Sequence, residues 1–390
     1  MNARFATSLL LTTMIGATAL NASAQIPAPA APSQAAPVAP APAPAISLSA
    51  ALEGFYQWNT NRPPDRINLL RAYDTRANTF GVQQAALVIE SAPNVDAGRR
   101  AGLRVDLQFG QATDTVQGNG ANEPRPGVYR HVWQAYGSYV APWHNAQIDF
   151  GKFGSNLGFE TNYAKDNNNF SRALLFNFLP FYHMGLRATV PLSDKVTVMY
   201  MLTNGVQQTE DFNNFKSNHF TAIVKPAASL TWTASYYMGQ EQPDRDQPNG
   251  PDGFFRVFDT YASWTVTPSL SLGADVNHVS SRVTRTSEAG TLTGAAAYVR
   301  QQLGRGAFAV RYEHLDDKGG LFGGVPQTLQ EVTITAERAV TDGLIVRAEL
   351  RRDWSDRAFF TDRTGAATKT SQPTALIGLI WSMGDKKGVW

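Results

Sequence analysis

Residues 342–354 read DGLIVRAELRRDW, and this short stretch decides the fold of the chain. Aliphatic side chains occupy every second position from Leu344 to Leu350. The alternate positions hold the charged row Arg347, Glu349, Arg351 and Asp353. Such alternation places successive side chains on opposite faces of a β-strand. In a soluble sheet the apolar face meets a packed core, whereas in an outer-membrane barrel it meets lipid and the charged face lines water.

The same alternation recurs from Leu48 onward and predicts about sixteen strands of roughly 9–13 residues, the length that a tilted strand needs to cross a bilayer. The expected spans are 48–59, 78–91, 101–112, 130–141, 146–154, 180–191, 195–204, 217–226, 229–240, 254–267, 269–281, 291–303, 306–315, 328–339, 343–354 and 372–384.

The connections between these strands alternate in length. Short ones are tight turns, as at Thr341-Asp342-Gly343. The long, polar ones are 60–77, 113–129, 155–179, 205–216, 241–253, 282–290, 316–327 and 355–371. The two ends of a soluble sandwich are equivalent, so this asymmetry favours an outer-membrane barrel with short periplasmic turns and long external loops. We therefore predict an all-β fold, a transmembrane antiparallel up-and-down β-barrel with both termini in the periplasm.

The first residues predict export to the bacterial envelope. Residues 1–24 have the pattern of a cleaved signal peptide, with Arg4, an apolar segment and the small residues Ala22-Ser23-Ala24. Residues 25–47 are rich in Pro and Ala and are expected to form a disordered periplasmic tether, and residues 48–390 to form the barrel in the outer membrane. Removal of the signal lowers the net charge from +2 to 2 − 1 = +1, which gives no electrostatic case for nucleic acid.

The chain has no cysteine, so it forms no disulfide and holds no thiolate metal site. Its six histidines form no metal-binding pair, and Asp244–Gly250 resembles a calcium loop but lacks the required acid, with Phe255 in that position. Calcium bridging between external loops stays open, although no motif supports it. No catalytic motif occurs in the right context, so we predict neither an enzyme nor a cofactor.

The charged faces are expected to line a hydrated lumen, because a charge facing lipid at mid-bilayer costs about 2–4 kcal/mol and dry burial would cost more. Aromatic residues near strand ends are expected to form lipid-interface girdles. These are Phe55, Tyr56, Trp58, Trp143, Phe153, Trp232, Trp264 and Trp381.

Loop 155–179 is the longest and the least polar, which is unfavourable for an exposed loop. We predict that it folds inward and narrows the channel; a lid over the rim or a trimer contact is the alternative. The candidate pore-lining and constriction residues are Arg104, Asp106, Glu160, Lys165, Asp166, Arg172, Arg187, Arg311, Glu313, Glu331, Glu337, Arg347, Glu349, Arg351 and Asp353.

Several segments also resemble a known family. Phe55–Asn59, Asp149–Gly154 and Asn169–Arg172 resemble strands and loops of the β-barrel porin family of OmpL-like outer-membrane proteins of Gram-negative bacteria. The resemblance implies a porin role, and a homotrimer is an expectation at the family level. We therefore predict a water-filled channel for passive diffusion of small hydrophilic solutes or ions. The alternative is an adhesin or structural barrel that acts through its external loops.

Overall fold

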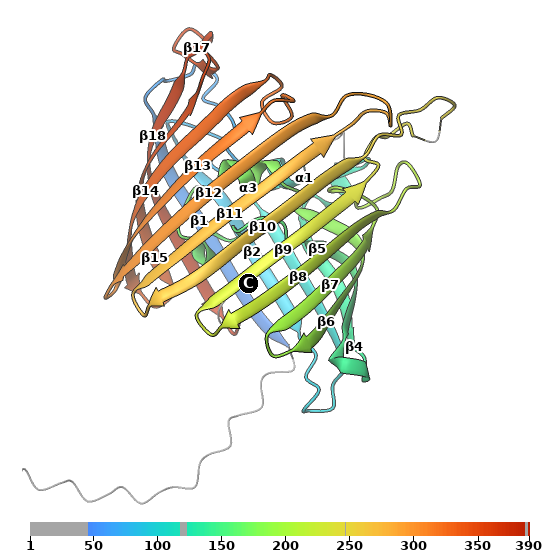
Figure 1. The fold of residues 1–390 in the computed structure, drawn as a ribbon. Coiled ribbons are helices and arrows are strands. Elements are labelled where there is room, and N and C mark those ends of the chain that lie inside the picture. The colour runs from blue at the N-terminus through green and yellow to red at the C-terminus, as the bar shows by residue number, and fades with distance from the viewer. Residues whose placement is uncertain (1–45, 118–122, 246, 387–388) are drawn as a thin grey trace, which may run out of the picture. The chain divides into compact units, whose positions relative to one another are not determined.

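The computed structural model describes residues 46–117, 123–245, 247–386 and 389–390. Within them, sixteen strands pair into one closed antiparallel barrel (Figure 1). The barrel strands are β1 (Ser47–Asn59), β2 (Thr79–Ser91), β3 (Ala101–Phe109), β4 (Val132–Val140), β5 (Gln147–Gly154), β6 (Tyr182–Ser193), β7 (Val196–Thr203), β8 (Ser217–Ala227), β9 (Leu230–Gly239), β10 (Phe255–Thr267), β11 (Leu270–Ser281), β12 (Gly290–Leu303), β13 (Gly306–Asp317), β14 (Gln327–Thr341), β15 (Leu344–Ser355) and β18 (Ser371–Gly384).

Each strand pairs with the next barrel strand along the chain, and β18 pairs with both β15 and β1 to close the barrel. The predicted fold is confirmed, and the sixteen expected spans match the observed strands to within three residues at each end. The sequence did not indicate the hairpin of β16 (Phe360–Thr361) and β17 (Ala367–Lys369) in the last long loop. The helical turns in the loops are α1 (Ala112–Gln117), α2 (Pro126–Tyr129), η1 (Trp143–Asn145), η2 (Ala164–Asp166) and α3 (Leu174–Phe178).

The barrel has one end of short turns and one end of long loops. Gly343, with φ +80°, closes the turn between β14 and β15, a conformation that favours glycine. Ser49 pairs with Gly384, so β1 begins and β18 ends at the short-turn end. Among the described helices, none has the length and apolar character needed to span a membrane. The predicted signal peptide and most of the predicted tether, residues 1–45, lie outside the described residues.

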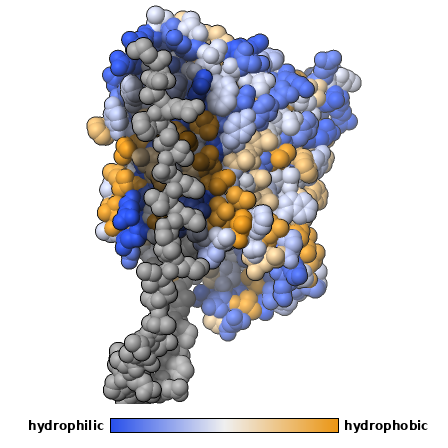
Figure 2. Space-filling view, turned by 60° about the vertical axis from the view of Figure 1, so that its left-hand side comes forward, coloured by the Kyte–Doolittle hydropathy of each residue, from blue (hydrophilic) through white to orange (hydrophobic). Residues whose placement is uncertain are grey.

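The two faces of the strands follow the predicted parity. In β15, Leu350 is 64% exposed on the outer face, whereas the Arg347 and Glu349 side chains point into the barrel and are buried. Figure 2 shows apolar side chains gathered over the middle of the outer face. Such a band is what a lipid-facing surface requires.

The aromatic girdle prediction is wrong for two of its residues. Phe55 and Phe153 are buried on the inner face, where Phe55 packs against Phe170 and Phe153 lies beneath the guanidinium of Arg187. Their strand parity, which they share with inward-facing polar neighbours, decides their direction. The outward-facing members with exposed rings are Tyr56, Trp58, Trp143, Trp232 and Trp264.

Candidate functional site

The candidate site is the inner loop, residues 155–179 between β5 and β6, together with the wall that holds it. The loop carries η2 and α3 and lies inside the barrel, because its backbone contacts Glu349 in the middle of β15. Leu174 and Leu175 of α3 are buried among inward-facing apolar side chains of the barrel wall. The apolar content that predicted an inward fold therefore forms a core within the barrel.

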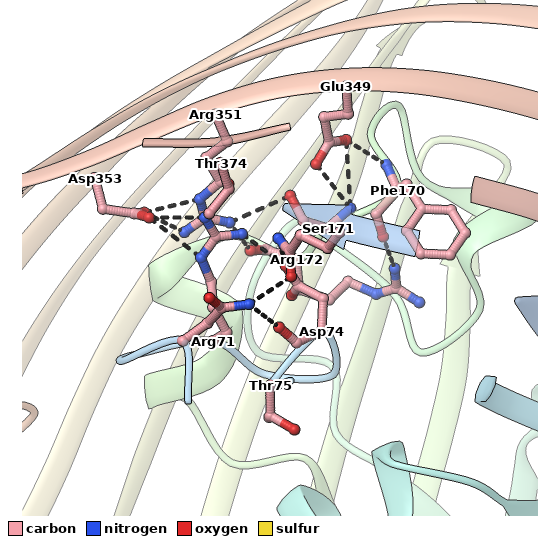
Figure 3. Close-up of polar contacts among 12 residues, drawn as sticks. Arg71, Asp74, Thr75, Phe170, Ser171, Arg172, Glu349, Arg351, Asp353 and Thr374 are labelled. Atoms are coloured by element: carbon pink, nitrogen blue, oxygen red, sulfur yellow. Dashed lines mark hydrogen bonds and ion pairs between the residues drawn. The ribbon is translucent and has the colours of Figure 1, made fainter. Parts of the chain in front are cut away.

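Wall carboxylates hold the loop by its backbone amides. Glu349 accepts hydrogen bonds from Phe170 N at 2.8 Å and Ser171 N at 3.2 Å (Figure 3). Glu313 accepts them from Leu174 N at 2.7 Å and Leu175 N at 3.0 Å. A carboxylate that accepts two successive N–H groups forms charge-assisted bonds, which are stronger than bonds between neutral groups.

Glu53 and two further wall carboxylates hold other parts of the same loop. Glu53 of β1 accepts Ala164 N at 2.6 Å. Asp259 of β10 accepts Gly158 N at 2.9 Å, and Asp275 of β11 accepts Phe159 N at 3.0 Å. These bonds tie the start of the loop to β10 and β11 and the Ala164 amide to β1, which is far from them in the sequence.

Wall arginines hold the same loop by its carbonyl oxygens. Arg347 donates to Ala164 O at 2.7 Å and to Asn167 O and Asn169 O at 2.8 Å. Arg351 donates to Arg172 O. The alternating row on β15 therefore matches the loop backbone, since its arginines meet C=O groups and Glu349 meets N–H groups. Asp353, the last residue of the row, pairs with Arg351 at 2.7 Å.

Arg311 is the centre of a buried ion network. Its guanidinium lies 2.7 Å from Glu331 on β14 and 2.7 Å from Glu160 on the inner loop, and it donates to Ser171 O at 2.8 Å. Glu313 lies 3.8 Å away on the same strand. Breaking such a buried pair leaves an uncompensated charge, which costs about 3–5 kcal/mol.

Arg172 fastens the loop to itself, and it also lies 3.7 Å from the wall carboxylate of Glu53. It donates to Asn162 O at 2.6 Å and to Phe170 O at 2.7 Å, and its guanidinium lies 5.1 Å from the centre of the Tyr73 ring. Tyr73 belongs to the first long loop, which also enters the barrel. From that loop, Arg71 reaches Asp353 at 2.8 Å (Figure 3).

Phe170 sits in a pocket that only glycine leaves open. A Cβ on Gly378 of β18 would lie 2.3 Å from the Phe170 ring, so the ring rests directly on the backbone of the wall. Phe55, Leu376 and Ile380 complete this apolar contact. Polar bonds on β13 to β15 and this apolar contact on β18 and β1 together fix one side of the loop.

Lys165 and Asp166 lie at the base of the loop. They pair at 2.7 Å, and Trp390 covers them: its ring centre lies 4.5 Å from Lys165 Nζ, and its backbone N–H donates to the Asp166 carboxylate at 3.1 Å. Burial lowers the pKa of the Lys165 ammonium, although the Asp166 carboxylate opposes this shift.

The structure places the candidate residues in two groups. The larger group surrounds the inner loop: Glu160, Arg172, Arg311, Glu313, Glu331, Arg347, Glu349, Arg351 and Asp353. The rest lie on the loop base and on other parts of the wall: Arg104, Asp106, Lys165, Asp166, Arg187 and Glu337.

The expectation that water hydrates this charged wall is wrong for the larger group. Arg311, Glu313 and Glu331 have no exposed surface, because the inner loop covers them. Their dry burial is tolerated because each charge meets an opposite charge or a loop backbone group, which offsets the loss of water.

Sequence reasoning missed several wall and loop residues of the site. Glu53, Asp259 and Asp275 stand at inward positions of their strands, so the parity that selected the other acids could have found them. Arg71 and Asp74 lie in an irregular loop and pair at 2.7 Å, and no periodicity marks them. Among the described residues, no three His, Asp or Glu side chains are grouped to hold a metal ion.

The fold and this inner loop define the class of outer-membrane porin barrels. A family model described as "Putative beta-barrel porin-2, OmpL-like" matches residues 45–383, and the chain belongs to this family. No curated protein sequence matches the chain.

Solved porins share the fold at low sequence identity. The trimer form of OmpT from Vibrio cholerae has a TM-score of 0.56 and 11% identity, covering 87% of this chain and 99% of its own. An anion-selective porin from Comamonas acidovorans has a TM-score of 0.58 and 8% identity, with coverage of 87% and 99%. Salmonella typhi OmpF in complex with daunomycin has a TM-score of 0.54 and 14% identity, with coverage of 87% and 97%. At these identities the likeness concerns the fold alone.

Proposed function

We propose that this outer-membrane porin conducts small hydrophilic solutes or ions by passive diffusion, through a lumen that the inner loop narrows. The observation that carries the proposal is that the inner loop lies inside the barrel, where wall side chains from β1, β10, β11, β13 and β15 bond to its backbone. Toward the short-turn end of β6 to β11, inward-facing polar residues keep exposed surface: Thr189, Thr197, Lys225, Thr231, Ser263, Thr265 and Ser271. A barrel of about sixteen strands is too wide for wall side chains alone to fill.

In this proposal the short turns face the periplasm and the long loops face the exterior. Residues 1–24 would be removed on export, and residues 25–47 would act as a periplasmic tether. We also propose that the chain assembles as a homotrimer, as the OmpT relative does in its trimer form. The barrel would act as a channel and not as an enzyme.

Recording from the purified chain in planar lipid bilayers tests this function. The proposal predicts stepwise increases in conductance, whereas an adhesin or structural barrel would leave the bilayer silent at high protein concentration. A variant that lacks residues 160–172 should give larger steps, because the segment that narrows the lumen is gone. Silent bilayers would defeat the proposed function, and unchanged steps in the variant would remove the loop from the constriction.

A further inference from the structure

We propose that the lumen selects for small anions by means of a belt of partly exposed cations below the inner loop. This inference rests on the proposed function and adds the class of solute. The charge belt consists of Arg104, Asp106, Glu90, Lys386, Lys165, Asp166, Arg347, Glu337, Arg300, Asp149 and Arg187.

The belt is continuous from β12 to β3. Arg300 of β12 pairs with Glu337 of β14 at 2.6 Å, and Glu337 pairs with Arg347 of β15 at 2.7 Å. Arg347 donates to the carbonyl of Ala164, the residue before Lys165. The side chains of the inner-loop base thus continue the belt along the wall.

Trp390 joins the loop base to the other half of the belt. Its ring lies over Lys165, and its indole N–H donates to Lys386 O at 3.2 Å. Lys386 pairs with Glu90 of β2 at 2.6 Å, and Glu90 lies 3.8 Å from Arg104 of β3.

Arg187 of β6 extends the belt beyond Arg104. Its guanidinium stacks 5.2 Å from the ring centre of Tyr136 on β4, and Tyr136 in turn pairs in register with Arg104 of β3. It also pairs with Asp149 at 2.7 Å. A solute that has passed the inner loop therefore meets these charges along the wall from β12 through β1 to β6.

The cations of the belt face the lumen more than the acids do. Five cations keep 10–22% of their side-chain surface exposed: Arg104, Lys165, Arg187, Arg300 and Lys386. Of the five acids, only Glu90, at 17%, reaches that range. As a set, the cations of these ion pairs thus keep a larger exposed fraction of their side chains than the acids do, which favours anions.

The acids are less exposed because they bond to the wall behind the cations. Asp106 accepts bonds from Gln134 at 2.9 Å and from the Tyr163 hydroxyl at 3.1 Å. Asp149 accepts one from the Ser138 hydroxyl at 2.6 Å. The longer Arg and Lys side chains extend past them and carry only donor groups, which suits a carboxylate, a phosphate or chloride.

The test is the reversal potential in planar bilayers under a potassium chloride gradient. Wild-type channels should give a chloride-to-potassium permeability ratio above that of an uncharged pore. In the Arg300→Gln variant, Glu337 keeps Arg347 as its partner, so the fold is expected to survive. Loss of one exposed charge should lower the ratio about twofold at low salt and less at 1 M salt, where screening is strong.

Arg285→Gln is the matched control, because Arg285 pairs with Asp252 in the external loops at 2.9 Å and lies outside the belt. It should leave the ratio unchanged. Glu90→Gln removes the most exposed acid of the belt and should raise the chloride-to-potassium ratio. If Arg300→Gln fails to fold, this second variant tests the inference. Channels that prefer potassium, or a permeability ratio that is unchanged in both Arg300→Gln and Glu90→Gln, would overturn the inference and leave the proposed function standing. Absence of any conductance would instead defeat the proposed function.

Discussion

Glu349 gives the sharpest test of how the inner loop is held. Its carboxylate accepts the amides of Phe170 at 2.8 Å and Ser171 at 3.2 Å and the Thr335 hydroxyl at 3.0 Å, all inside the barrel. The Glu349→Gln substitution preserves the shape of the side chain. It removes the charge and turns an NH₂ group toward one of the two loop amides.

The magnitude follows from these contacts. One charge-assisted hydrogen bond to a loop amide is lost, which costs about 1.5–3 kcal/mol, and the buried N–H left without an acceptor costs about 1–3 kcal/mol more. A total of about 3 kcal/mol corresponds to a shift of roughly 100-fold in the equilibrium between the anchored and released loop, at 1.4 kcal/mol for each factor of ten.

Hydrogen–deuterium exchange of the inner loop in lipid or detergent measures this shift. The Phe170 and Ser171 amides should exchange faster in Glu349→Gln, while the β15 backbone stays protected. Glu288→Gln, at an exposed position of an external loop, is the matched control and should change nothing in the inner loop. If the Phe170 and Ser171 amides exchange at the wild-type rate in this variant, the Glu349 carboxylate does not hold the loop.

Three further perturbations probe the lipid face, the apolar contact and a buried loop acid. Leu350→Arg on the outer face should destabilise the barrel by about 2–4 kcal/mol, seen as a lower urea midpoint for the barrel in lipid vesicles; an unchanged midpoint would speak against lipid contact. Phe170→Ala should cost about 3–5 kcal/mol of local stability and make the inner loop more sensitive to protease, and equal sensitivity would contradict the packing on Gly378. Burial raises the pKa of Glu241 in the loop after β9, where its carboxylate accepts Val206 N at 2.9 Å. A carboxyl with a raised pKa stabilises the folded loop fully below its unfolded pKa, and this stabilisation is lost as pH rises through the folded pKa. Hydrogen exchange at the Val206 amide, corrected for the intrinsic exchange rate, should therefore accelerate with pH over that range, and Glu241→Gln should abolish this pH dependence. An equal pH dependence in both proteins would contradict the role of Glu241.

The fold was predictable because barrel strands encode it locally. The parity of residues 342–354 assigns each side chain of β15 to lipid or lumen without knowledge of any partner, and turn lengths order the strands. The girdle prediction for Phe55 and Phe153 failed because it used their position near strand ends and not strand parity. Parity points Phe55 inward together with Glu53 and Gln57. Parity is the stronger constraint because a one-residue shift reverses every side chain.

The details of the site were not predictable in the same way. Glu349 and Arg347 meet backbone groups of a loop about 180 positions earlier in the chain, and any residue type supplies the same N–H and C=O groups. The sequence therefore marks the charged wall but not what covers it. Arg71 adds a partner from an irregular loop, whose position depends on tertiary packing alone.

The absence of cysteine allows a direct test of water on the inner face and lipid on the outer face. Ser263 faces the lumen and is exposed, and its neighbour Ala262 faces outward. Ser263→Cys and Ala262→Cys, each the only thiol in its protein, are placed in sealed vesicles and treated with a small, membrane-impermeant methanethiosulfonate from the long-loop side. Rapid modification of Cys at position 263 and protection at position 262 are the expected results. Modification at 262 with protection at 263 would show that the faces are reversed or that no aqueous path passes the inner loop.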